Sequence, residues 1–254
     1  MRFDRVENQF YSPDDQRAVQ VRRLFAAIAR RYDLLNDVMS AGLHRCWKRR
    51  LVKLAGQPRD VLDLCCGTGD IALRFSGNVV GADFSAEMLQ VARSRGALRA
   101  PRTTGAEGKG RTQCAPTWIQ ADALRLPFPD ESFDVVSVGY GLRNLADLPV
   151  GLGEIRRVLR PGGKMVSLDF GKPECGLWRR LYFAHLRFWV PVLGKLMVGQ
   201  RDAYAYILTS LENYPAQRGV RQLMEECGFT GCGFEEFWGG SMAINFGQKP
   251  PVRR

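Results

Sequence analysis

A chain of 254 residues is long enough for one sizeable α/β domain and short for two. Its apolar fraction of 45% and charged fraction of 25% exclude a largely disordered chain. The formal net charge of +11 indicates either attraction to an anionic partner, such as nucleic acid, acidic lipid or a phosphorylated ligand, or simply solubility.

The seven cysteines form no C-x-x-C pair and have no zinc-binding spacing, so we expect free thiols and no metal site. Residues 1–11 are polar and charged, which predicts no signal peptide and a reduced, cytoplasmic protein. The most apolar long segment, residues 177–200, is interrupted by three arginines and a lysine. We therefore do not expect it to cross a bilayer.

Hydrophobic periodicity predicts a polar arm, a helical region, and then strands that alternate with helices. The predicted helices are 17–54, 70–75, 86–94 (capped by Ser85), 148–159, 177–200, 204–211 and 217–227. The predicted strands are 61–64, 78–83, 118–120, 133–140, 164–170, 232–237 and 242–246.

This alternation predicts one α/β domain over residues 1–254, with a mostly parallel, Rossmann-like sheet of seven strands and helices on both faces. The last two strands flank a Gly-Gly turn, which predicts a hairpin and an antiparallel edge strand. Residues 95–117 are rich in Gly, Pro, Thr and basic residues, and we interpret them as a flexible surface insertion.

The stretch 61-VLDLCCGTGD-70 carries an acid, Asp63, four residues ahead of the first glycine of a predicted turn. Gly67 and Gly69 permit close approach of a ligand at the carboxyl end of the strand. The letters G-T-G-D-I-A also fit a loose dinucleotide pattern, but Asp63 would repel a pyrophosphate. S-adenosylmethionine has no phosphate and carries an ammonium and a sulfonium, so it suits this acid better.

Two further acids end the next two strands. Asp83 lies 20 positions after Asp63, where a carboxylate can accept both ribose hydroxyls. Asp122 can accept from the adenine amine beside the Ala123 N–H, or can cap a helix. Met88 can cover the adenine face or pack in the core. Three acids on successive strand ends predict S-adenosylmethionine as the cofactor, and the same loops add Thr68, Phe84 and Tyr140 as expected contacts.

Three stretches carry a resemblance to a known family: 32-YDLLNDVMSAGLHRCW-47, 141-GLRN-144 and 157-RVLRPGGKMVSLDFGKP-173. The chain resembles the class I methyltransferases and, within them, the UbiE/MenG family of quinone C-methyltransferases. It departs from the usual pattern at four positions: Leu35, Arg160, Asp169 and Gly171.

The resemblance implies methylation of a polyprenylated hydroquinone, most simply demethylmenaquinol to menaquinol. A 2-methoxy-6-polyprenyl-1,4-benzoquinol of ubiquinone biosynthesis is the alternative. An RNA methyltransferase is a remote third reading, because the basic residues are dispersed and no RNA-binding module is recognisable, so we expect no nucleic acid partner. A homodimer and a peripheral contact with the inner face of the membrane stay open.

A phenol has a pKa near 10, so catalysis needs a group that favours its deprotonation. Arg143 is the expected phenolate stabiliser, unless it forms a surface ion pair, and Asn144 is expected to position the hydroxyl or a water. His44 is either the proton acceptor or a structural residue of the lid.

The resemblance also implies where the substrate binds. Residues 1–55 would form a helical lid, with Tyr32, Asn36 and Trp47 facing the substrate. Residues 174–215 would form a helical region for the substrate and its tail, contacted by Trp178 and Tyr182 on one stripe. The same stripe is also compatible with an amphipathic core helix or with contact to the membrane surface.

Overall fold

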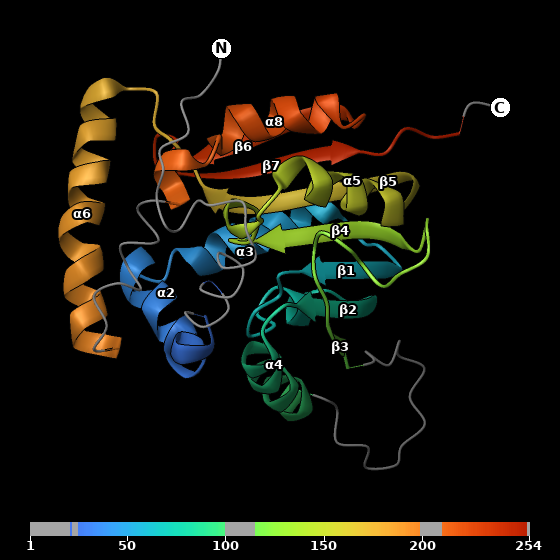
Figure 1. Cartoon of the computed structure of the whole chain (residues 1–254), viewed down its shortest axis with the longest axis horizontal. Coiled ribbons are helices and arrows are strands. Elements are labelled where there is room, and N and C mark those ends of the chain that lie inside the picture. The colour runs from blue at the N-terminus through green and yellow to red at the C-terminus, as the bar shows by residue number, and fades with distance from the viewer. Residues whose placement is uncertain (1–20, 22–24, 100–114, 199–209, 253–254) are drawn as a thin grey trace.

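The computed structural model describes residues 21, 25–99, 115–198 and 210–252, and only the backbone of residues 30, 99 and 189–198. Its centre is one sheet with the strand order β3-β2-β1-β4-β5-β7-β6 (Figure 1). The strands are β1 (Asp60–Leu64), β2 (Asn78–Asp83), β3 (Thr117–Gln120), β4 (Phe133–Gly139), β5 (Leu159–Phe170), β6 (Thr230–Phe237) and β7 (Met242–Gln248).

Strands β1 to β5 pair in parallel, and β7 pairs antiparallel with both β5 and β6. The mostly parallel sheet of seven strands with antiparallel pairing at one edge is therefore confirmed. In detail, the hairpin returns into the sheet, so that β7 lies one place inside the edge and β6 is outermost.

The helices differ from prediction mainly at the N-terminal end. They are η1 (Ala29–Arg31), α2 (Tyr32–Ser40), α3 (His44–Ala55), η2 (Ala72–Arg74), α4 (Ala86–Arg99), η3 (Leu142–Asn144), α5 (Leu148–Val158), α6 (Gly176–Val198) and α8 (Ala216–Glu226). The predicted continuous helix 17–54 is wrong in its described part, because Ala41 (φ 48°) and Gly42 (φ 77°) adopt left-handed backbone conformations that end α2.

Three other boundaries need correction. The helix predicted over 70–75 is a single 3₁₀ turn, η2. Helix α4 continues to Arg99 and β3 begins at Thr117, so the ends of the predicted insertion 95–117 are regular structure. Its middle, residues 100–114, lies outside the described residues, as does most of the predicted helix 204–211.

Alternate residues of the strands bury against helices on opposite faces of the sheet. Val61 of β1 joins a core cluster with Leu51 of α3. Leu62, the next residue, joins a cluster with Ile155 of α5 and Val220 of α8. This two-sided burial is the expected consequence of a strand that is apolar on both faces, and it confirms the helices on both faces.

The sheet places the site at the carboxyl ends of its central strands. β1 has β2 on one side and β4 on the other, and this reversal of strand order opens a crevice beyond the strand ends. Helix α6 stands outside the sheet layers, beside α2 (Figure 1), and Leu186 of α6 shares a core cluster with Leu35 of α2. Among the described helices, none is long and apolar enough to cross a membrane.

Candidate active site

The turn after β1 is fastened to the end of β2. Gly67 has a φ of 54° and donates its backbone N–H to Asp83 Oδ2 at 2.7 Å. The other carboxylate oxygen of Asp83 accepts from the Ser85 N–H at 2.9 Å, and Ser85 Oγ caps α4 by accepting from the Met88 N–H at 3.3 Å. Burial raises the pKa of Asp83 above its usual range.

Asp63 is buried beneath this turn, and both of its oxygens have protein donors. Oδ1 accepts from Ser137 Oγ at 2.6 Å, and Oδ2 accepts from the Ala72 N–H at 2.9 Å. Burial raises the pKa of Asp63 to about 7, and the hydrogen bond from Ser137 opposes that shift. Asp63 borders a small cavity of about 20 Å³ together with Gly67, Thr68 and others, not the larger cavities described below.

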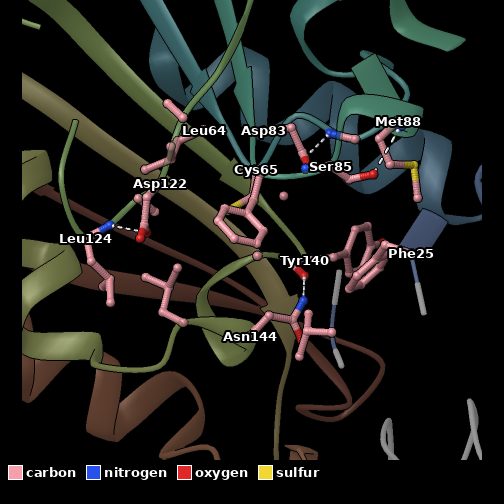
Figure 2. A pocket seen from close by; sticks show the side chains of 18 of the residues that line it. Phe25, Leu64, Cys65, Asp83, Ser85, Met88, Asp122, Leu124, Tyr140 and Asn144 are labelled. Atoms are coloured by element: carbon pink, nitrogen blue, oxygen red, sulfur yellow. Dashed lines mark hydrogen bonds between the residues drawn. The ribbon is translucent and has the colours of Figure 1, made fainter. Parts of the chain in front are cut away.

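A cavity of about 140 Å³ lies at the ends of β1 to β4 (Figure 2). Asp83 and Asp122 reach it from the ends of β2 and β3, as predicted for ribose and adenine contacts, and Asp122 Oδ1 accepts from the Leu124 N–H at 2.9 Å. Its further lining includes the predicted cofactor contacts Gly67, Phe84, Met88, Ala123 and Tyr140. Asn144, which was predicted to position the substrate hydroxyl or a water, also lines this cavity and not the larger one.

These residues fit a nucleoside with cationic groups. A Cβ added at Gly67 would meet only Tyr32 at 3.9 Å, which leaves the turn open toward the cavity. Asp83 and Asp122 keep acceptor capacity for hydroxyl and amine donors, because each carboxylate has more lone pairs than the hydrogen bonds it accepts here.

Two residues of the glycine turn do not border this cavity. Gly69 lies against the core, where an added Cβ would come within 2.4 Å of the Trp118 ring, so its backbone serves packing. Thr68 borders the small cavity beside Asp63, and its hydroxyl donates to Asp33 Oδ1 of α2 at 2.9 Å. Arg95 of α4 pairs with Asp33 and donates to Thr68 Oγ1 at 3.0 Å, which joins α2, the turn and α4.

Tyr140 borders the small cavity, the 140 Å³ cavity and a third, larger cavity described below. It follows β4 with a φ of 60°, which is uncommon for a bulky residue. Its backbone oxygen accepts from Asn144 Nδ2 at 3.0 Å (Figure 2) and also from Arg143 Nη1 at 2.9 Å. Its backbone N–H donates to the Leu168 oxygen at 2.7 Å. Arg143 and Asn144 of the G-L-R-N stretch therefore stabilise the left-handed backbone conformation of Tyr140.

Arg143 is buried, and among the described residues it lines neither the small cavity, nor the 140 Å³ cavity, nor the larger cavity described next. Its guanidinium pairs with Asp169 at 2.6 Å between Nη1 and Oδ1, and it lies over the Phe170 ring at 4.8 Å from the centroid. The surface ion pair left open from the sequence is therefore wrong: the pair is an internal one.

A second and larger cavity, of about 680 Å³, lies on the other side of Tyr140. Helices α2, α3 and α6 and the turn between β6 and β7 form its walls. Among the described residues that line it there is no Asp, Glu, Lys or Arg. It brings together most of the predicted substrate residues and one predicted catalytic residue: Asn36, His44, Trp47, Trp178 and Tyr182.

Some residues of this region differ from expectation. Tyr32 borders the cofactor cavity and the small cavity, not the larger one. Three residues of the wall were not predicted from the sequence: Phe170 at the end of β5, and Trp238 and Ser241 in the turn between β6 and β7. The turn 238-WGGS-241 was identified only as a hairpin turn. Its contact with α6, where Trp178 Nε1 donates to the Trp238 oxygen at 3.0 Å, spans 60 residues and has no local signal.

The fold and these cavities define a class I S-adenosylmethionine-dependent methyltransferase. One similar solved structure, a SAM-dependent methyltransferase from Thermotoga maritima, is 18% identical, covers 90% of this chain and 99% of that one, and has a TM-score of 0.62. Another, a phosphoethanolamine N-methyltransferase 2 from Haemonchus contortus in complex with S-adenosyl-L-methionine, is 18% identical and covers 80% of this chain and 52% of that one, with a TM-score of 0.54.

The chain belongs to the ubiE/COQ5 methyltransferase family, whose model matches residues 12–249. A similar protein of Azotobacter vinelandii, the ubiquinone/menaquinone biosynthesis C-methyltransferase UbiE, is 39% identical over 94% of this chain and 93% of its own. The protein of the same name from Stutzerimonas stutzeri is 37% identical over 94% and 92%. The predicted family, the fold class and S-adenosylmethionine as methyl donor are thereby confirmed.

Proposed function

We propose that this methyltransferase methylates a ring carbon of a polyprenylated hydroquinone, converting demethylmenaquinol to menaquinol. One observation carries the proposal: Tyr140 separates the cofactor cavity from a larger cavity whose described lining has no Asp, Glu, Lys or Arg. Such a cavity suits a neutral, largely apolar acceptor. The names of the curated relatives, which cover ubiquinone and menaquinone biosynthesis, support the same class of substrate.

The walls of the large cavity favour a flat bicyclic ring. Trp47, Phe170, Trp178 and Trp238 contribute aromatic surface from four separate elements. Aromatic side chains stack or pack edge-on against ring systems, and a naphthoquinol offers more area for this than a benzoquinol. The methoxy-benzoquinol of the ubiquinone pathway is the alternative substrate.

RNA is a poorer match for this cavity. Recognition of nucleic acid depends on basic groups that neutralise phosphates. The described lining of the acceptor cavity has no arginine or lysine, although the chain has a net charge of +11. The basic residues that give the chain its net positive charge therefore lie outside the described lining of this cavity.

The reaction requires a quinolate, and its formation at neutral pH costs about 4 kcal/mol for a phenol with a pKa near 10. Arg143 was expected to supply this stabilisation directly. Its ion pair with Asp169 and its hydrogen bond to the Tyr140 oxygen support a different role, in which Arg143 and Asn144 position Tyr140 between donor and acceptor. Tyr32 would shield the methyl donor from water, since it borders the cofactor cavity from the lid.

The tail of the substrate would leave along α6, and the outer side of this helix would touch the membrane surface. Leu177, Leu181 and Phe188 are 70%, 54% and 64% exposed and share one helical stripe. Leu181 also borders the large cavity, so the exposed stripe is continuous with its wall. Arg180, which is exposed beside the stripe, would favour anionic lipid.

Vesicle flotation tests this contact. A variant with Leu177→Asp and Phe188→Asp should lose association with anionic vesicles, while Leu98→Asp, at an 86% exposed position of α4, should keep it. Equal flotation of both variants and the unaltered protein would remove the membrane part of the proposal.

Methyl transfer from labelled S-adenosylmethionine tests the function itself. Demethylmenaquinol, the methoxy-benzoquinol and total RNA are offered in parallel reactions. We expect label in the naphthoquinol product at the highest kcat/KM. Label only in RNA would overturn the proposal, and preference for the benzoquinol would reassign the pathway.

A further inference from the structure

The His44 ring has one nitrogen held by an acid and the other without a hydrogen bond. His44 opens α3 and is 3% exposed. Its Nε2 lies 2.8 Å from Asp37 Oδ1 of α2. Its Nδ1 is buried and has no hydrogen-bond partner among the described residues. Since buried polar atoms nearly always have a partner, this nitrogen can receive a hydrogen bond from a bound ligand.

Asp37 determines which nitrogen carries the proton. Arg45 holds the carboxylate by two hydrogen bonds, Nε to Oδ1 at 2.9 Å and Nη2 to Oδ2 at 2.6 Å. These bonds lower the pKa of Asp37, so it stays ionised and can only accept. The neutral imidazole therefore has its hydrogen on Nε2 and its lone pair on Nδ1.

The location of His44 points to the partner. His44 borders the large cavity proposed for the acceptor. The Nδ1 lone pair can therefore receive a hydrogen bond from a hydroxyl group bound in that cavity. Asn36 lines the same cavity, and its side chain also contacts Tyr32.

We infer that His44 Nδ1 accepts the proton of the quinol hydroxyl beside the methylated carbon, and that Asp37 is the positioning residue that fixes the imidazole for this role. The inference rests on the proposed function, because it requires a quinol in the large cavity. It also decides between the two roles of His44 that the sequence left open.

The charges around His44 are compatible with a neutral base. Arg45 and Lys48 lie on its own helix, Asp37 on α2 and Asp70 after the glycine turn, and His185 of α6 borders the same cavity. Burial lowers the pKa of His44, against the hydrogen bond with Asp37 that raises it. The imidazole is then unprotonated near pH 7 and free to take a proton.

The proton balance is complete with these groups. The O–H bond breaks, the proton moves to Nδ1, and the oxygen's electron pair shifts density to the ring carbon. When bound, S-adenosylmethionine supplies the methyl group, as the ring carbon's electron pair forms the C–C bond and the C–S electrons stay on sulfur. His44 then returns its proton to the oxygen, the ring carbon loses its hydrogen to solvent as a proton, and one proton is released in total.

Glutamine at position 44 separates the two roles. In His44→Gln the side-chain amide can keep the hydrogen bond to Asp37, but no proton acceptor remains where Nδ1 was. We expect kcat to fall about 100-fold or more, as for loss of a general base, with the KM for both substrates within about twofold. Arg49→Gln, on the exposed side of α3, is the matched control. A His44→Gln rate within about threefold of the unaltered enzyme would overturn the inference.

Asp37→Asn tests the positioning role. The amide can donate to Nε2 and so move the ring hydrogen to Nδ1, and we expect a large loss of kcat with little change in KM. Nitrogen-15 spectra of His44 provide a readout that does not depend on activity. Nδ1 should be unprotonated in the unaltered protein and protonated in Asp37→Asn, and protonated Nδ1 in the unaltered protein would overturn the assignment. If the unaltered enzyme methylates no quinol, the proposed function fails, while these spectra still report on the tautomer.

Discussion

Arg143 donates a 2.9 Å hydrogen bond from Nη1 to the backbone oxygen of Tyr140, a residue that lines both the cavity proposed for the methyl donor and the cavity proposed for the acceptor. A tyrosine in the left-handed region costs free energy that the surroundings must supply, on the order of 1–3 kcal/mol. The arginine is itself fixed by Asp169 at the end of β5. A buried ion pair thus supports the backbone of the residue that the two proposed ligand cavities share.

Replacing the ion pair by neutral groups tests whether Arg143 acts by positioning Tyr140 or through its own positive charge. Arg143→Ala should lower the free energy of unfolding by roughly 3–5 kcal/mol, because Asp169 is left buried without its partner. The double variant Arg143→Gln/Asp169→Asn keeps a donor for the Tyr140 oxygen and buries no net charge. We expect it to keep kcat within about tenfold of the unaltered enzyme. A double variant that folds but loses more than about 1,000-fold in kcat would show that the guanidinium charge itself acts on the quinolate.

Asp63→Asn should remove a pH dependence of stability. The pKa of Asp63 is raised from 3.8 to about 7, so the folded state keeps a proton that the unfolded chain has released. The stability from this protonated carboxyl is complete below pH 3.8 and is lost as the pH rises through about 7, by up to about 4 kcal/mol. Asparagine can accept from Ala72 and donate to Ser137, so the variant should gain stability relative to the unaltered protein between pH 5 and pH 8 in urea unfolding.

The same variant tests the contact expected from the sequence. If the Asp63 carboxylate attracts the ammonium of S-adenosylmethionine, Asp63→Asn should lower the affinity for S-adenosylmethionine. The affinity for adenosine, which lacks the ammonium, should not change. Equal affinities for S-adenosylmethionine in both proteins would assign Asp63 to the support of the turn alone. Ser137→Ala, which removes one donor and keeps the acid, is the matched control.

The fold was largely predictable because its signals are local. The β2 boundaries at Asn78 and Asp83 and the Ser85 cap agree with prediction, since an apolar run and a hydroxyl before a helix act over a few residues. The break between α2 and α3 was not predicted, because alanine rarely adopts a positive φ and Ala41 therefore gives no sequence signal for it. The extension of α4 to Arg99 was hidden by its glycine and its mixed polar pattern.

The site residues at the ends of strands could be predicted from the sequence. The contacts between segments that are distant in the sequence could not. Asp83 and Asp122 border the cofactor cavity as expected from the register of parallel strands. Arg143 was assigned to the substrate because the sequence cannot tell that Asp169, 26 residues later, pairs with it. The sequence gives no signal for Asp37, since its contact with His44 appears only once α2 and α3 fold back on each other.

The link between Asp33, Thr68 and Arg95 should control retention of the cofactor. Arg95→Gln removes the cation that joins α4 to α2, the helix expected to act as a lid, and to the glycine turn. Both partners are about one-third exposed, so we expect less than about 1 kcal/mol of lost stability. Dissociation of S-adenosylmethionine should accelerate several-fold, because α2 is released from the turn. Stopped-flow displacement measures this, with Arg93→Gln on the same helix as control. Equal dissociation rates would show that the lid does not retain the cofactor through this link.

Gly69 and Gly153 differ in the space around their Cα atoms, so alanine should have opposite effects on stability at the two positions. Gly69 has a φ of 78°, and an added Cβ would lie 2.4 Å from the Trp118 ring and 3.2 Å from the Ala92 Cβ. Gly69→Ala should therefore destabilise the protein by about 2 kcal/mol or more. Gly153, exposed within α5, has no atom within 4 Å of such a Cβ, and Gly153→Ala should stabilise by about 0.5–1 kcal/mol. Urea unfolding of both variants measures the difference. If Gly69→Ala unfolds at the same urea concentration as the unaltered protein, the packing of the turn against Trp118 does not constrain it.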